Sequence, residues 1–185
     1  MTAPDNSADP PPQGPTEAFA TENARLRQLN TAPPVHSGET HHALAESVWI
    51  SLDPTPGVFL SFEPVADGFR LEMPNAGRSR WISLSFALSH EVLAQGRFLG
   101  LRTDTETAGF LSFRLCLRYV LQDGSFRDVF CPDYTISSGG RRDQISYVEI
   151  DPALATLCAS AECHLFFQGA EFDVTFREID LLLMR

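Results

Sequence analysis

From residue 47 onward, apolar and polar residues alternate with a period of two. In the clearest run, Leu111, Phe113, Leu115, Leu117 and Tyr119 alternate with Ser112, Arg114, Cys116 and Arg118. Successive side chains of a strand point to opposite faces, so this pattern predicts a strand with one core face and one more polar face. Comparable runs lie at 48–52, 58–62, 69–73, 81–88, 97–102, 126–130, 144–150, 163–167 and 172–183.

Turn-forming residues separate these runs, among them Asp67-Gly68, Asp123-Gly124 and Gly139-Gly140. Many short strands divided by turn signals are typical of a β-sandwich or barrel. The 14 Phe residues suit a β core, because Phe buries a large apolar area and favours strands. We therefore predict an all-β fold, an antiparallel jelly-roll β-sandwich. Residues 137–142 are predicted as a hairpin loop.

Helix is expected in only two connections of the sandwich. Ser89 begins a segment of about two turns that Gly96 ends, and Asp151-Pro152 begins another that runs to about Leu157. Ser is a favoured N-cap residue, and Pro is favoured at the first helical position.

Residues 1–46 have a different composition from the rest, with many prolines and few large apolar residues. Such a segment buries too little surface to offset its chain entropy, so the sequence predicts a flexible Pro-rich arm or anchor at 1–46 and a sandwich domain at 47–185. Two alternatives remain for Phe19, Leu26 and Leu29. They belong either to a solvated tail or to a short helix, capped by Thr16, that becomes ordered on another subunit.

The charge of the chain excludes several partners. Asp and Glu number 24 against 14 Lys and Arg, so the net charge is −10, and the densest basic point, Arg141-Arg142, is followed by Asp143. Phosphate backbones and anionic lipids repel such a chain, and we expect neither nucleic-acid binding nor membrane insertion. The N-terminus lacks the pattern of a signal peptide, so synthesis in the cytoplasm is expected, with incorporation into a virus-like particle left open.

No catalytic motif is recognisable. Gly-x-Ser-x-Gly does not occur, and Ser89-His90 is better explained as a helix cap followed by an exposed His. Cys163 and His164 are neighbours in a predicted strand, so their side chains are expected to diverge, one to the core and one to the surface. We therefore predict that the protein is not an enzyme.

No cofactor is predicted either. Cys158, Cys163 and His164 have the wrong spacing for a zinc site. Calcium is an alternative, because Asp104, Glu106, Asp123 and Asp128 fall near predicted turns, but no local run supplies the six or more oxygens that Ca²⁺ requires.

Glycan recognition relies on aromatic platforms and planar polar side chains. The residues that we select as ligand-binding candidates are Tyr134, Arg141, Arg142, Trp81 and Asp128. Tyr134 follows Cys131-Pro132-Asp133 and is the aromatic residue most clearly placed in a loop. The two arginines could bind hydroxyls or carboxylates of an acidic sugar.

From Trp81 to Leu183 the chain resembles the jelly-roll sandwiches of carbohydrate-binding and galactose-binding-like modules. The resemblance lies in the runs 81–86, 111–121 and 172–181 and in the Asp123-Gly124 hairpin. A Pro-rich arm joined to a jelly roll also resembles head-spike or fibre-base proteins of tailed phages and phage-like gene transfer particles. There the arm would anchor the protein, and the sandwich would hold or present a glycan-binding fibre.

These patterns favour a non-catalytic attachment module that binds glycans or forms a surface spike. Its expected partners are a glycan, protein subunits reached through the arm, and further copies of the chain in a homo-oligomer. One alternative is a carbohydrate-active enzyme, or its accessory domain, that uses loop carboxylates. Another is a purely structural subunit without a small ligand.

Overall fold

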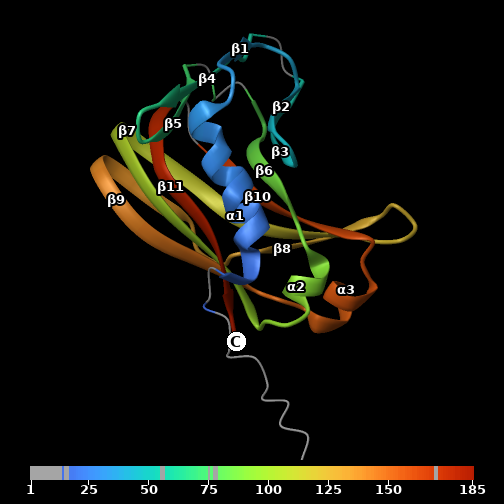
Figure 1. Ribbon diagram of the computed structural model, residues 1–185. Helices are drawn as coiled ribbons and strands as arrows, with labels where there is room; N and C mark the ends of the chain where they lie inside the picture. The colour runs from blue at the N-terminus through green and yellow to red at the C-terminus, as the bar shows by residue number, and fades with distance from the viewer. Residues whose placement is uncertain (1–13, 15–16, 55–56, 75, 77–78, 169–170) are drawn as a thin grey trace, which may run out of the picture.

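The computed structural model describes residues 14, 17–54, 57–74, 76, 79–168 and 171–185. The strands of this part are β1 (Val35–Ser37), β2 (His41–Ala45), β3 (Val48–Leu52), β4 (Leu60–Val65), β5 (Gly68–Met73), β6 (Ile82–Leu88), β7 (Phe98–Val120), β8 (Phe126–Phe130), β9 (Thr135–Glu149), β10 (Ser160–Gln168) and β11 (Phe172–Met184). The helices are α1 (Ala20–Arg27), α2 (His90–Leu93) and α3 (Pro152–Leu157), and 3₁₀ turns at Glu17–Phe19 and Gln28–Thr31 flank α1. The predicted all-β class is confirmed (Figure 1).

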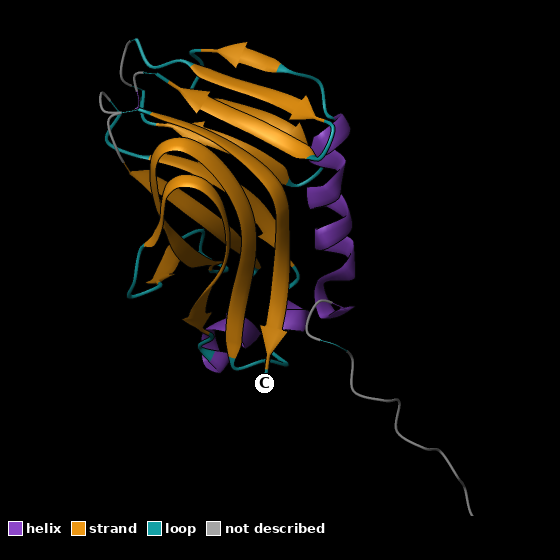
Figure 2. Cartoon of the chain, turned by 90° about the vertical axis from the view of Figure 1, so that its left-hand side faces the viewer, coloured by secondary structure: helices purple, strands orange, loops and turns teal. Residues whose placement is uncertain are grey.

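The described strands form one antiparallel hydrogen-bonded path that folds over at β7 into two layers (Figure 2). Layer A contains β1, β4, β5, β11 and the first half of β7, and layer B contains β2, β3, β6, β10 and the second half of β7. β9 and β8 pair with the other side of β7. The predicted sandwich is therefore present, with a long strand shared between its two layers.

β9 follows the bend of β7 from layer B into layer A. Residues 135–138 of β9 pair with 110–113 of β7, and residues 140–149 pair with 98–107. Gly139 and Gly140 lie between these parts with φ of 68° and 72°, a conformation that glycine adopts readily. The hairpin loop predicted over 137–142 is thus wrong. The two glycines bend one continuous strand, because the alternation of β9 resumes on both sides of them.

The core lies between the layers, and the sequence pattern places it correctly. Leu111, Phe113, Leu115, Leu117 and Tyr119 are all at most 1% exposed. Phe172, Val174 and Phe176 of β11 are also buried in this core. The alternation predicted for these two strands is confirmed, because only one face of each strand lies between the layers.

The N-terminal segment departs from the expected flexible arm. Phe19 and Leu29 are 0% exposed, Leu26 is 4% exposed, and all three belong to the core of the sandwich. α1 lies between β11 and β6 (Figure 1), and β1 and β2 pair with β4 and β3. Residues 17–45 are therefore part of the folded unit, which does not begin at residue 47. The short helix considered for this segment is formed, but it is docked on its own chain. Thr16, its expected cap, and residues 1–13 lie outside the described residues.

Asn23 of α1 binds the edge of strand β11 and thereby fixes the position of the helix on the sandwich. β5 pairs with β11 only over Phe172–Phe176, so the adjoining part of β11 leaves one side of its backbone without that neighbour. Asn23 of α1 donates from Nδ2 to the Leu181 carbonyl (3.1 Å) and accepts at Oδ1 from the Leu181 N–H (2.7 Å). Its side-chain amide thus takes the place of a neighbouring strand at a sheet edge.

Asn23→Ala is expected to lower the free energy of unfolding by about 2–5 kcal/mol, because two buried backbone groups of Leu181 lose their partner. Chemical denaturation monitored by tryptophan fluorescence measures this change. Asn30→Ala, at an exposed position of the next turn, is the matched control and should change it by less than about 0.5 kcal/mol. An equal effect of both variants would show that the pairing with Leu181 contributes nothing.

Both predicted connections form a helix with the expected cap, although α2 has only four residues, fewer than the two turns expected. Ser89 Oγ accepts from the N–H of Val92 (3.3 Å), and Asp151 Oδ1 accepts from the N–H groups of Ala153 (2.9 Å) and Leu154 (3.1 Å). Within the described residues the longest α-helix, α1, has eight residues, and no helix is long and apolar enough to cross a membrane.

Candidate functional site

The outer face of layer B brings together side chains from strands that are far apart in the sequence. Its composition follows from the strand register, which aligns residues in rows across the strands. One row is Trp49, Ser85, His164, Cys116 and Phe130. The next rows on either side are Ser51, Ser83, Phe166 and Arg114, and Ala87, Glu162, Arg118 and Asp128. We call the depression over these rows the layer B groove. Its lining residues are His41, Trp49, Ser51, Trp81, Ser83, Arg118, Glu162, His164 and Phe166.

Aromatic rings form a continuous chain across the layer B groove. The Trp49 ring lies edge-on to the His164 ring, with centroids 6.4 Å apart. The His164 ring stacks on Phe166 at 5.5 Å, and Phe166 lies 5.8 Å from Phe130 on the edge strand β8. Trp49 and Phe166 are half-buried and Phe130 is exposed, whereas His164 is almost fully buried, so the row offers aromatic surface on either side of His164 on which ring-shaped ligands can stack.

Two arginines extend this surface at the β8 side. The Arg114 guanidinium lies 4.8 Å from the ring centre of Phe130 and 5.5 Å from that of Tyr134. The Arg118 guanidinium lies 4.2 Å from the ring centre of Phe126. Stacked guanidinium groups of this kind are held flat, with less freedom to lose when a ligand binds.

Both arginines are already bound to acceptors of the protein. Arg118 donates to both carboxylate oxygens of Asp128 (2.7 and 2.8 Å), and Arg114 donates to the Cys131 carbonyl (2.7 Å). The hydrogen bonds that Arg118 donates to Asp128 raise the pKa of Arg118 above its usual value. The charge of Arg118 is therefore neutralised by Asp128, whereas Arg114, bound to a carbonyl, keeps its positive charge.

His164 is a buried polar side chain in the lining of the groove, at 4% exposure. Ser85 donates its hydroxyl proton to Ser83 (3.0 Å), and Nδ1 of His164 lies 2.8 Å from the same hydroxyl oxygen, a contact that fits a ring with its proton on Nδ1. Nε2 lies 3.0 Å from a Glu162 oxygen, but without the geometry of a hydrogen bond, and it has no hydrogen-bond partner among the described residues. A buried ring nitrogen without a partner is costly, and a ligand hydroxyl in the groove would supply one.

Ser85, His164 and Glu162 have the residue types of a hydrolytic triad, but their arrangement does not suit nucleophilic attack. Ser85 is 0% exposed and directs its proton to Ser83, so a substrate carbonyl cannot reach its hydroxyl. We interpret this group as the support that fixes the orientation of the His164 ring.

The structure places three of the five predicted ligand-binding residues at or beside the groove. Trp81 lines it at 41% exposure, and Asp128 orients Arg118 from the adjoining row. Tyr134, 43% exposed, stacks on Arg114 and accepts a hydrogen bond from Gln168 (3.1 Å). Trp81 directly precedes β6, Asp128 lies on β8 and Tyr134 directly precedes β9. β6 belongs to layer B, and β8 and the start of β9 pair with the second half of β7, so the three residues come together.

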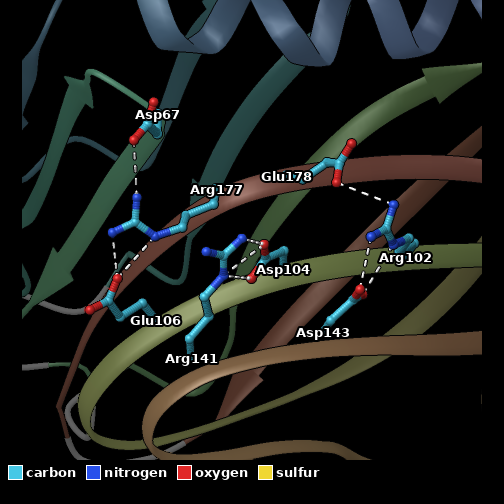
Figure 3. Close-up of polar contacts among 8 residues, drawn as sticks. All are labelled: Asp67, Arg102, Asp104, Glu106, Arg141, Asp143, Arg177 and Glu178. Carbon is cyan, nitrogen blue, oxygen red and sulfur yellow. Dashed lines mark hydrogen bonds and ion pairs between the residues drawn. The ribbon is translucent and has the colours of Figure 1, made fainter.

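Arg141 and Arg142 lie elsewhere, on the part of β9 that belongs to layer A. Arg141 is bound to Asp104, with its Nε 2.9 Å from Oδ1 (Figure 3). Two further arginines form ion pairs beside it: Arg102 with Asp143 and Glu178, and Arg177 with Glu106 and Asp67. The Arg102 guanidinium lowers the pKa of Asp143, whereas burial and a hydrogen bond with Asp180 raise the pKa of Glu178. Arg141 is therefore occupied by an ion pair, and Arg142 is exposed on the same half of the strand. The two arginines do not join the groove.

The carboxylates considered for calcium are used inside the fold. Asp104 and Asp128 accept from Arg141 and Arg118, Glu106 from Arg177, and Asp123 from the hydroxyl and N–H of Ser125. Across the described ranges, no group of three His, Cys, Asp or Glu side chains is placed to hold a metal ion. The four cysteines are free thiols and all are buried. Burial raises the pKa of Cys116, under the groove floor, to about 12.

Sequence reasoning missed Phe166, Arg118, Glu162 and His164 in the groove, and Phe130 and Arg114 beside it. The signal was present in β10, where Glu162, His164 and Phe166 alternate with the core residues Cys163, Leu165 and Phe167. The expected divergence of Cys163 and His164 is confirmed. His164 is nevertheless almost fully buried, because the side chains of neighbouring strands cover it.

No protein-family model matches the chain, and no curated protein matches it in sequence. Several solved structures are similar in fold. The CBM22-1 xylan-binding domain of Paenibacillus barcinonensis Xyn10C has a TM-score of 0.48 at 10% identity, with 74% of this chain and 86% of that chain covered. The C-terminal family 22 carbohydrate-binding module of Clostridium thermocellum Xyn10B has a TM-score of 0.47 at 11% identity, with 80% and 92% covered.

The N-terminal cellulose-binding domain of Cellulomonas fimi β-1,4-glucanase C has a TM-score of 0.48 at 9% identity, with 74% of this chain and 89% of that chain covered. These similar structures are carbohydrate-binding modules, the class of β-sandwich that the sequence resembles.

Proposed function

We propose that the chain is a non-catalytic glycan-binding module and that the layer B groove is its binding site. The observation that carries this proposal is the row of rings from Trp49 through His164 and Phe166 to Phe130. In its middle lies Nε2 of His164, which makes no hydrogen bond to any described residue. Sugar rings stack on aromatic faces, and their hydroxyls need acceptors between those faces. The groove offers both on one rigid sheet.

A neutral glycan fits this groove better than an acidic one. Arg114 and Arg118 are already bound to a carbonyl and a carboxylate, and Glu162 adds a negative charge beside His164. The chain as a whole carries a net charge of −10. An acidic polysaccharide would meet these negative charges, and Arg118, the arginine that lines the groove, is already neutralised by Asp128. This differs from the acidic sugar suggested by the Arg141-Arg142 pair.

The experiment is a calorimetric titration of the full chain with neutral polysaccharides, such as xylan and β-glucan, and with acidic alginate. We expect saturable binding of a neutral polysaccharide without release of reducing ends. Trp81→Ala is expected to weaken that binding at least tenfold, about 1.4 kcal/mol, because an exposed stacking platform is removed.

Phe59→Ala is the matched control, since Phe59 is exposed (56%) but does not line the groove. It should bind like the wild type. Equal affinity of Trp81→Ala and the wild type, or no binding of any neutral polysaccharide, would contradict the proposed site. Release of reducing ends would instead support the carbohydrate-active enzyme considered from the sequence.

A role as a spike or fibre-base component of a phage-like particle stays a prediction from the sequence. That role requires the N-terminal arm to anchor the protein on another subunit. Residues 17–45 are used within the same chain, as α1, β1 and β2 pack on the sandwich. This arrangement favours a self-contained binding module over one that is completed by its anchor.

A further inference from the structure

The edges of the two layers differ in how they are protected. β1 and β2, which end the described strand path, are only three and five residues long. The edge of β11 is bound by Asn23 of α1. Short edge strands and a covering helix are common ways of preventing unwanted strand pairing.

β9 lacks such protection. It is 15 residues long, and in the described part of the chain it pairs along one side only, with β7. It lies at the left margin of Figure 1, with no other labelled element outside it. Its outer-face residues in layer A are, in order, Arg141, Asp143, Ile145, Tyr147 and Glu149.

The middle of this edge is apolar and exposed. Ile145 is 57% exposed and Tyr147 is 55% exposed. Phe98 of β7 adjoins them, with its ring edge-on to Tyr147 at 5.7 Å. A long, exposed strand edge with apolar side chains is a template for pairing with another strand.

We propose that the layer A half of β9 pairs antiparallel with the same strand of a second copy of this chain. If Ile145 lies opposite Ile145 of the second copy, the order of charges makes the pairing self-complementary. Arg141 then lies opposite Glu149, and Asp143 lies opposite Tyr147, whose hydroxyl can donate to it. A register moved by one pair in one direction would instead set Asp143 against Glu149, two like charges, and in the other direction it would set Asp143 against Ile145 and leave Glu149 without Arg141.

This register also fixes how the two molecules are oriented. Residues that lie opposite each other in an antiparallel pair point to the same face of the sheet. The outer faces of the two layer A sheets therefore continue into each other across the β9 edges. The two-fold axis is then perpendicular to the sheet. The outer faces of both layer B sheets consequently point to the same side of the dimer. The pairing itself does not depend on the proposed glycan site.

The test is sedimentation velocity of the full chain over a range of concentrations. The wild type is expected to form a dimer, and Ile145→Lys, which sets two like charges together at the axis, is expected to raise the dissociation constant at least tenfold. The matched control is Ile136→Lys. Ile136 lies on the same strand and is 52% exposed, but it pairs in the layer B half of β9.

A second measurement uses Ile145→Cys, which is expected to form a disulfide between two copies under mild oxidation, whereas Ile136→Cys is not. The native cysteines are buried and do not interfere. Thermal unfolding of each variant checks that the fold is retained. A wild type that stays monomeric at every concentration, or an Ile145→Lys variant that dimerises as well as the wild type, would overturn the proposal.

Discussion

A chain that begins at residue 47 is expected not to fold, although the composition of residues 1–46 suggests a dispensable arm. Phe19, Leu26, Leu29 and Leu44 are each at most 5% exposed in the core. Burial of such a side chain contributes about 1.5–3 kcal/mol. The loss of four is comparable to the whole stability of an ordinary domain, about 5–15 kcal/mol.

Far-UV circular dichroism and denaturant titration of the truncated chain measure this effect. A chain that begins at residue 14 keeps all four side chains and Asn23 and serves as the control, for which we expect a cooperative transition. Cooperative unfolding of the chain that begins at residue 47 would restore the boundary predicted at residue 46. It would also show that α1 contributes little to the core.

Phe113→Ala is expected to lower the free energy of unfolding by about 3–5 kcal/mol, because it leaves a cavity at the centre of the sandwich. Phe113 is 1% exposed, and its ring centre lies 5.9 Å from that of Phe167 and 6.5 Å from that of Phe176. It therefore joins β7 to both β10 and β11, where the layers share a strand.

Denaturation of this variant has an internal comparison on the same strand. Phe110 lies three residues earlier on β7 and is 55% exposed, so Phe110→Ala should change the free energy of unfolding by less than about 0.5 kcal/mol. If the two variants proved equally stable, the assignment of faces along β7 would be incorrect.

The two proposals have a joint consequence for binding strength. A dimer through β9 would present two layer B grooves on the same side, and a polysaccharide has many equivalent sites. Once one groove is bound, the second binds at a high effective concentration, so the dimer would bind a polymer more tightly than a single groove does. Ile145→Lys would then weaken binding to long polysaccharides while leaving binding to short oligosaccharides unchanged.

Much of this protein follows from its sequence alone. The period of two assigned the core face of β7 and β11 correctly, and local residue preferences located α2 and α3 with their caps. These features depend on neighbours a few residues away, where backbone geometry and side-chain hydrogen bonds act directly. The alternation of polar and apolar residues therefore determined the fold class.

Only the tertiary structure decided where the N-terminal segment lies and which residues share the groove. Leu181 lies 158 residues from Asn23, and no local pattern indicates that a side-chain amide completes that strand edge. Likewise, Trp49, His164 and Phe130 share a row only because β3, β6, β10, β7 and β8 pair in one register. Register is set by the packing of the whole core, since a slip of one residue would turn each strand's polar face inward.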